Sequence, residues 1–173
     1  PKIEDNFKRI FSEETAYQIT SILEGVIKRG TGKKLKKLNL DLAGKTGTTN
    51  DNTDAWFIGY TSNLAIGVYV GHDEPKSLGK YETGAKAALP VFKKFVKKAV
   101  KKRDALPFKV PIDIKIVIVD AETGLKPSDK TKKIIYESFK SNDTFIVDIE
   151  KLSNKNRLEL YDSSTQNKIL KFY

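Results

Sequence analysis

Apolar residues near the start of the chain recur at the spacing of an α-helix. The positions that share this spacing are Ala16, Ile19, Leu23 and Val26. Ser12 precedes them as a good N-cap, and Gly30 follows them as a residue type that ends helices. The pattern therefore predicts a helix over residues 12–29.

The pattern changes after a basic stretch at residues 30–39, which we expect to be a flexible loop. Leu38, Leu40 and Leu42 alternate with polar residues, as in a strand with one buried face. This alternation predicts a strand that runs from Leu38 into the segment "AGKTGTTND" at residues 43–51.

Two aromatic and β-branched runs follow, "DAWFIGYT" at residues 54–61 and "LAIGVYVG" at residues 64–71. Such residues favour strands, and the turn-forming residues between the runs predict a hairpin. Together with the preceding segment, the sequence predicts three consecutive antiparallel strands. Within the first run, we expect Trp56 and Phe57 to pack the sheet rather than stack on a ligand.

Helical spacing returns over residues 82–103. The predicted apolar stripe consists of Ala85, Ala88, Phe92, Phe95 and Ala99, with Thr83 as a plausible cap and Pro90 as a start or kink. The opposite face carries Lys93, Lys94, Lys97, Lys98, Lys101 and Lys102. A solvated face is the simplest interpretation of these lysines, and contact with an anionic surface remains open.

The part of the chain beyond residue 106 reads as an appendage. A linker, "RDALPFKVP", leads into the strand-like run "IDIKIVIVD" at residues 112–120. Beyond Leu125 the sequence is polar, and we expect weak order in about the last 25 residues. The expected division is therefore 1–106 for the main domain and 107–173 for an appended strand and polar tail.

Composition narrows the classes of function. The net charge is +10 and the pI about 9.5, which favours anionic partners. The chain has no cysteine and a single histidine, His72, so thiolate and multi-histidine metal sites are excluded. No apolar run approaches the roughly 18 residues that a membrane-spanning helix needs.

A basic nucleic-acid-binding or other anion-binding module remains an alternative at this stage. The aromatic residues, however, fall within the apolar runs, and the lysines are spread over several segments. No RNA-binding signature occurs, so specific nucleic-acid binding is not expected.

The segment "AGKTGTTND" allows two interpretations. Gly44-Lys45-Thr46 is similar to the end of a phosphate-binding P-loop, but that motif needs glycine at the position of Asn39. It also needs a helix after the lysine, and the residues from Gly47 onward are poor residues for the start of a helix. A P-loop NTPase is therefore the remote alternative.

The second interpretation rests on Lys45-Thr46-Gly47, a signature of β-lactamases and penicillin-binding proteins. The surrounding segments are more specific than this motif. "AYQITSILEGVIKRGTG", "AGKTGTTND", "DAWFIGYT", "GVYVGHDEP", "TGAKAALPVFKKF" and "YESFKSNDT" together closely resemble class A penicillin-binding proteins, the bifunctional cell-wall synthases. The resemblance covers about residues 1–144 and implies an α+β fold, part of a β-lactamase/transpeptidase-like sandwich of helices around an antiparallel sheet.

The resemblance implies a D,D-transpeptidase, in which a serine attacks the penultimate D-alanine of a stem peptide. Lys45 would organise the proton network around that serine, Thr46 and Gly47 would shape the strand, and Thr48 would bind the carboxylate of substrate or drug. Strict alternation places Thr48 on the face opposite Lys45 and Gly47, so we expect a twist or bulge there.

Two further catalytic elements of that family are missing from residues 1–173. The nucleophile lies in Ser-x-x-Lys at a helix start, and the only match here, Ser77 to Lys80, falls in a predicted loop. Ser-x-Asn does not occur. We expect the chain to be the C-terminal part of the transpeptidase domain, inactive alone, with the nucleophile in upstream sequence.

The resemblance also implies partners and a location. The expected partners are a peptidoglycan stem peptide ending in D-Ala-D-Ala, β-lactams and the rest of the transpeptidase domain, with no cofactor or metal. The expected location is the periplasmic side of the bacterial inner membrane, with the anchor outside this chain. His72 is expected in a loop, and Asp54 is expected to hold a turn or contact Lys45.

Overall fold

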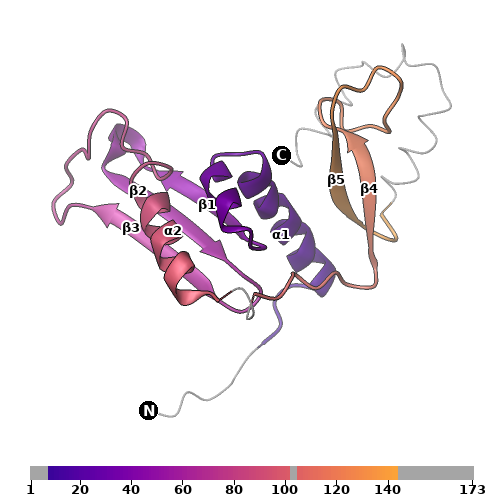
Figure 1. Ribbon diagram of the computed structural model, residues 1–173, viewed down its shortest axis with the longest axis horizontal. Coiled ribbons are helices and arrows are strands. Elements are labelled where there is room, and N and C mark those ends of the chain that lie inside the picture. Colours follow the sequence, from indigo (N-terminus) through magenta and orange to yellow (C-terminus); the bar gives the residue numbers. More distant parts are fainter. Residues whose placement is uncertain (1–7, 102–104, 144–173) are drawn as a thin grey trace. The chain divides into compact units, whose positions relative to one another are not determined.

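The chain forms two compact units, Pro1–Val110 and Pro111–Tyr173, in a computed structural model that describes residues 8–101 and 105–143 (Figure 1). The first unit contains α1 (Glu13–Lys28), the 3-10 helix η1 (Lys33–Leu38), β1 (Ala43–Thr48), the 3-10 turn η2 (Asn50–Asn52), β2 (Asp54–Tyr60), β3 (Ala65–Gly71) and α2 (Ala88–Ala99). The second unit contains β4 (Ile114–Asp120) and β5 (Ile134–Lys140).

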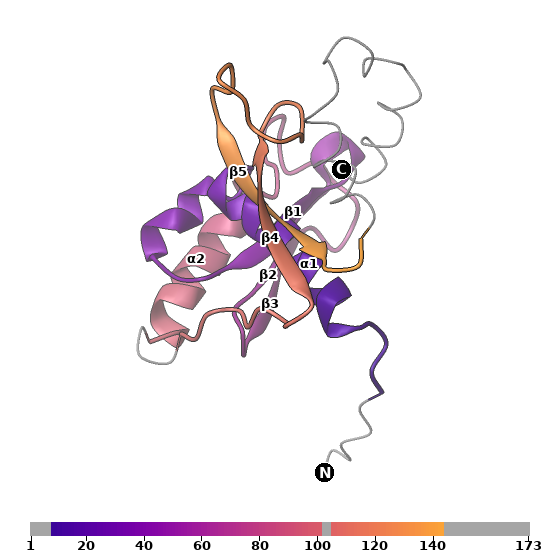
Figure 2. The same ribbon diagram turned by 90° about the vertical axis from the view of Figure 1, so that its right-hand side faces the viewer.

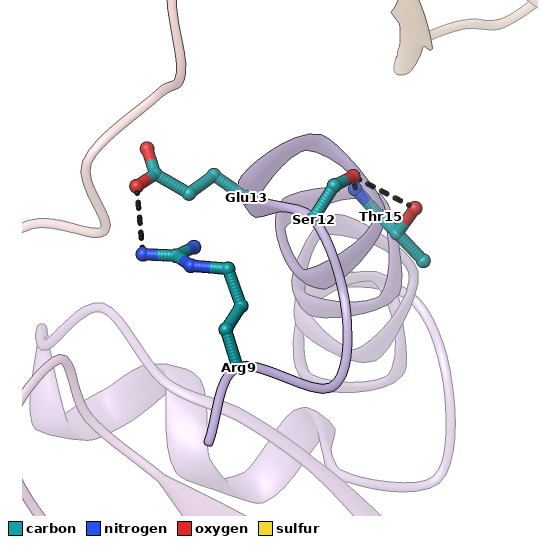
Figure 3. A network of polar contacts seen from close by, with 4 residues as sticks. All are labelled: Arg9, Ser12, Glu13 and Thr15. Atoms are coloured by element: carbon teal, nitrogen blue, oxygen red, sulfur yellow. Dashed lines mark hydrogen bonds and ion pairs between the residues drawn. The ribbon is translucent and has the colours of Figure 1, made fainter. Parts of the chain in front are cut away.

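The predicted N-cap of α1 is confirmed. The hydroxyl of Ser12 accepts a hydrogen bond from the N–H of Thr15 at 3.3 Å (Figure 3). In the same view, Arg9 forms an ion pair with Glu13, which lies in the first turn where the helix dipole favours an acid. At the other end, the N–H groups of Arg29 and Gly30 bond to carbonyls of the last turn, so the helix stops where the sequence indicated.

The expected flexible loop and the expected start of the first strand at Leu38 are both wrong. Residues Lys33–Leu38 form a 3-10 helix whose Leu35 is 1% exposed in the core. Asn39 then adopts the left-handed conformation, with φ 52°, and the strand begins only at Ala43. Burial of Leu35 between exposed lysines, rather than alternation of the leucines, decides the local structure here.

The three predicted antiparallel strands are confirmed, and they form a sheet in the order β1-β2-β3. One face packs on α2 (Figure 1). Phe57 of β2 meets Phe92 of α2 in the core there. The opposite face carries Trp56 and Ile58, which are 40% and 56% exposed. Between β2 and β3, the turn at Thr61 closes through its N–H to the carbonyl of Leu64.

Helix α2 is shorter than predicted, and its buried stripe differs from the predicted one. The turn at residues 84–87 precedes the helix, and Pro90 lies in the first helical turn, where its missing N–H costs nothing. The buried residues are Ala88, Leu89, Phe92 and Val96. Phe95 is instead 49% exposed, whereas Val96 is fully buried.

Thr83 also differs from its predicted role as a side-chain cap. The first helical residue has no side-chain cap, and it is the carbonyl of Thr83 that accepts the N–H groups of Lys86 and Ala87.

The second unit contains an antiparallel hairpin in which Ile114 pairs with Lys140 and Asp120 pairs with Ile134 (Figure 2). The sequence predicted strand β4 but not β5, which lies in a segment that we expected to be part of the polar tail. Glu137 and Ser138 interrupt the apolar pattern of β5, so its pairing with β4 decides its conformation. The expectation of weak order concerns residues from about 149 onward, which lie outside the described residues.

Candidate functional site

The segment Gly44-Lys45-Thr46-Gly47-Thr48 lies entirely within β1, at the edge of the sheet. Among the described residues, only β2 pairs with β1, in an unbroken register from Ala43↔Tyr60 to Thr48↔Ala55. The three-residue turn η2 and then β2 follow, where a P-loop would have an α-helix. The P-loop interpretation is therefore wrong.

Lys45 and Gly47 share the open face of the sheet. Lys45 is exposed, and its ammonium donates a hydrogen bond to the carbonyl oxygen of Thr46 at 2.9 Å. Gly47 lies opposite Trp56, and a Cβ at this position would be 3.2 Å from the Cβ of Trp56. Because glycine has no side chain, nothing blocks the surface of β1 at this position. Another backbone can therefore approach the strand beside the ammonium of Lys45.

Thr46 points to the other face of β1 and is tied to the end of α1. Its hydroxyl lies 3.1 Å from the hydroxyl of Thr31, which follows the helix. The preceding helix and the strand are thus linked at the middle of the Lys-Thr-Gly motif, so Thr46 has a visible part in holding the strand in place.

Thr48 lies on the same side of the strand as Thr46, at its exposed end. The expected bulge is not found, because the ladder runs regularly through Thr48. The hydroxyl of Thr48 instead accepts a hydrogen bond from the N–H of Gly84 at 3.0 Å. The pairing alone therefore does not bring Thr48 onto the face that Lys45 and Gly47 share.

Asp54 holds the neighbouring structure, as one of the two sequence interpretations proposed. Its carboxylate accepts hydrogen bonds from the hydroxyls of Tyr69 at 2.8 Å and Thr53 at 3.1 Å. The bond to Asp54 raises the pKa of Tyr69 above its usual value; burial and the charges of Asp54 and Asp73 act in the same direction. This network supports the strand ends beside the motif.

The aromatic residues of β2 divide between the two faces. Phe57 is fully buried, as expected, whereas Trp56 stands on the open face with its ring centroid 4.7 Å from that of Tyr69. Trp56 thus packs against Tyr69 of the neighbouring strand, and part of its ring is exposed beside Gly47.

The Ser77–Lys80 segment is a loop, as predicted, and does not form the helix start that a nucleophile motif requires. The hydroxyl of Ser77 donates to the carbonyl of Asp51 at 2.8 Å, and the side-chain amide of Asn52 donates to the carbonyl of Lys80. His72 is exposed in the same connection after β3. The hydrogen bonds of Ser77 and Asn52 hold the loop against the turn that follows β1.

Sequence reasoning missed Gly84 as part of this region. The signal was the Thr-Gly pair immediately before an apolar helix, which we interpreted only as a cap.

Over residues 8–101 and 105–143, no group of acidic and histidine side chains could hold a metal ion. No helix within those ranges is long and apolar enough to cross a bilayer.

The fold and the strand together define the class of penicillin-recognising proteins, in which a Lys-Thr-Gly strand lines the site. The family described as "Penicillin binding protein transpeptidase domain" matches residues 3–97, more than half of the chain. The chain therefore belongs to the penicillin-binding protein transpeptidase family.

Individual relatives agree with this assignment. The chain is 43% identical over 155 residues to penicillin-binding protein 1A of Rickettsia conorii, covering 89% of this chain and 19% of the relative. It is 42% identical over 138 residues to penicillin-binding protein 1A of Pseudomonas aeruginosa, covering 79% of this chain and 17% of the relative. The crystal structure of penicillin-binding protein 1A from Haemophilus influenzae superposes with a TM-score of 0.68 at 31% identity, covering 78% of this chain and 21% of that one. The chain thus spans about a fifth of the length of the relatives it matches.

Proposed function

We propose that this chain forms the substrate-strand wall of a peptidoglycan D,D-transpeptidase site. The observation that carries the proposal is the position of Lys45 and Gly47 on the open face of an edge strand. The substrate would be a stem peptide ending in D-Ala-D-Ala, and a β-lactam would occupy the same place. Membership of the transpeptidase family supports this choice of reaction.

The geometry of β1 suits a peptide that adds to the sheet as a further strand. In this kind of recognition, backbone hydrogen bonds along a sheet edge give affinity, and neighbouring side chains give specificity. Gly47 would let the peptide backbone approach, the ammonium of Lys45 would supply positive potential, and the hydroxyl of Thr48 would donate to the terminal carboxylate. Thr46 would hold the strand through its contact with Thr31.

The acyl transfer itself needs a serine from outside residues 1–173. That hydroxyl would attack the carbonyl of the penultimate D-alanine, the last D-alanine would leave with a proton, and an amine of a neighbouring peptide would then take the acyl group. Lys45 would take part in the proton network around the serine. Its ammonium would leave the carbonyl of Thr46 for the reacting groups.

The same proposal assigns the parts of the chain and its location. Residues 1–106 would be the C-terminal part of the transpeptidase domain, and 107–173 an appendage that contains the β4–β5 hairpin. The site would work on the periplasmic side of the inner membrane, with the anchor outside this chain. Neither the family nor the relatives support the nucleic-acid alternative, which a gel-shift measurement at moderate salt tests independently.

Labelling with a fluorescent penicillin tests the proposal. We expect residues 1–173 alone to remain unlabelled, and a longer polypeptide that includes the upstream sequence to be labelled. In the longer protein, Lys45→Ala should lower the acylation rate by about a hundredfold, the size of a lost proton-transfer contribution. Lys98→Ala, on the exposed face of α2, is the matched loss of a charge and should label at the wild-type rate.

Either of two results would contradict this proposal: covalent labelling of the 1–173 chain by itself, or labelling of the Lys45→Ala protein as fast as the wild type.

A further inference from the structure

The turn before α2 contacts the Lys-Thr-Gly strand through a single glycine. The N–H of Gly84 donates to the Thr48 hydroxyl oxygen at 3.0 Å, although 36 residues separate them in sequence. The carbonyl of Gly84 accepts the N–H of Leu89 at 2.9 Å, at the start of α2. Gly84 therefore joins the end of β1 to the helix that packs in the core.

The contact tolerates no side chain at residue 84. Gly84 is buried, and a Cβ there would lie 2.3 Å from the carbonyl oxygen of Trp56 and 2.5 Å from that of Gly47. Both neighbours are backbone atoms of the paired strands, so they cannot move aside as a flexible side chain can. The absence of a Cβ brings the N–H of Gly84 within reach of Thr48.

The hydrogen bond also determines which way the Thr48 hydroxyl can act. A threonine hydroxyl has one proton to donate and two lone pairs to accept with. The N–H of Gly84 occupies one lone pair, so the proton must point away from Gly84. Since Thr48 is exposed at the end of the edge strand, that proton is available to a ligand beside β1.

We infer that Gly84 is a positioning residue for carboxylate recognition: its N–H holds the Thr48 hydroxyl so that the hydroxyl donates its proton to the terminal carboxylate of the substrate. The inference rests on the proposed function, and it adds a residue from the turn before α2 to the site. Gly84 acts through Thr48 and does not itself touch the substrate.

The experiment compares penicillin with its methyl ester in a longer polypeptide that contains this chain and its upstream sequence. Gly84→Ala should slow acylation by both forms, because its Cβ displaces the backbone of β1 and β2, and should slow the carboxylate form by about tenfold more than the ester, as expected for loss of a hydrogen bond to a charged group. In a Thr48→Val background, Gly84→Ala should cause no further loss of carboxylate preference, because the two changes remove the same interaction. Gly67→Ala is the matched control, since a Cβ at Gly67 would have no atom within 4 Å.

Hydrogen exchange at the Gly84 amide gives a second measurement that does not require a change at Gly84. Thr48→Ser keeps an oxygen acceptor and should keep this amide protected, whereas Thr48→Val should raise its exchange rate by about tenfold or more. An equal loss of rate for acid and ester in Gly84→Ala, or continued protection of the amide in Thr48→Val, would overturn the inference. If the unmodified protein fails to react with penicillin at all, the proposed function fails first and the positioning role falls with it.

Discussion

Phe92 of α2 and Phe57 of β2 meet edge to face at the centre of the first unit. Their ring centroids are 4.7 Å apart, and both side chains are fully buried. Phe95 lies one turn further along the same helix but is half exposed. Within α2, one phenylalanine is therefore buried and the other half exposed, so position on the helix and not residue type determines burial.

This pair makes a direct prediction about stability. Phe92→Ala should lower the free energy of unfolding by about 3–5 kcal/mol, because it leaves a cavity in the packed core. Phe95→Ala should cost less than about 1 kcal/mol, since solvent already reaches the ring. Denaturant unfolding of both variants measures the difference, and equal losses would contradict the burial of the two side chains.

A second prediction at the residue scale concerns Tyr69 and pH. Its pKa lies above the usual value, mainly because the Tyr69 hydroxyl donates to Asp54. A raised pKa means that folding favours the protonated form. The resulting stabilisation is present below the unfolded pKa of about 10 and is lost as pH rises through the folded pKa.

Ultraviolet titration of the tyrosinate, assigned with Tyr69→Phe, measures this pKa. Asp54→Asn should lower it, because the acceptor charge is removed. Asp73→Asn is the control and should have a smaller effect, since Asp73 acts only through its charge. A larger effect from Asp73 than from Asp54 would show that the hydrogen bond is not the main cause.

At the scale of elements, the β4–β5 hairpin depends on Asp120 at the end of β4. Its carboxylate accepts the hydroxyl of Thr131 at 2.7 Å and the N–H groups of Glu122 and Thr123. These bonds favour the charged form and lower the pKa of Asp120, the bond from Thr131 most of all. One side chain thus holds together the connection between the two strands.

The lowered pKa predicts how the hairpin responds to acid. The stabilisation from Asp120 is present above the unfolded pKa of about 3.9 and is lost as pH falls through the folded pKa. Thr131→Val should raise the pKa of Asp120 towards its ordinary value, which the carboxyl-carbon chemical shift measures against pH. Thr123→Val should raise it less, because the side chain of Thr123 makes the smaller contribution. The opposite ranking would reject Thr131 as the main cause.

The sequence pattern predicted those helices and strands whose structure depends on interactions between residues close together in the chain. Helix α1 carries its own cap at Ser12, and β2 and β3 are joined by a short turn, so both appear in the sequence. The sequence did not predict the 3-10 helix η1 or strand β5. Burial of Leu35 determines η1 and pairing with β4 determines β5, and both depend on residues that are distant in the chain.

At the scale of the whole molecule, the first unit has a buried core made of its own residues. The buried cluster of the first unit lies between Ile27 and Val96, well before the second unit begins at Pro111. We therefore predict that a chain ending at Val110 still unfolds cooperatively, with the same denaturation midpoint for the first unit. Circular dichroism during denaturation measures this.

A chain ending at Leu89 is the control for that truncation, because it lacks the core residues Phe92 and Val96. It should not unfold cooperatively. Loss of cooperative unfolding in the chain ending at Val110 would show that the first unit needs residues beyond its own core.

The sequence by itself determined the residue types of the candidate site and the strand that carries Lys45 and Gly47. Alternation along a strand is a property of the backbone, so it needs no knowledge of distant parts. Only the tertiary structure decided that Gly84 meets Thr48 and that Trp56 stands open beside Gly47. Such contacts depend on how the sheet and the turn before α2 pack together, and on the lack of a Cβ at one buried position, which sequence spacing does not reveal.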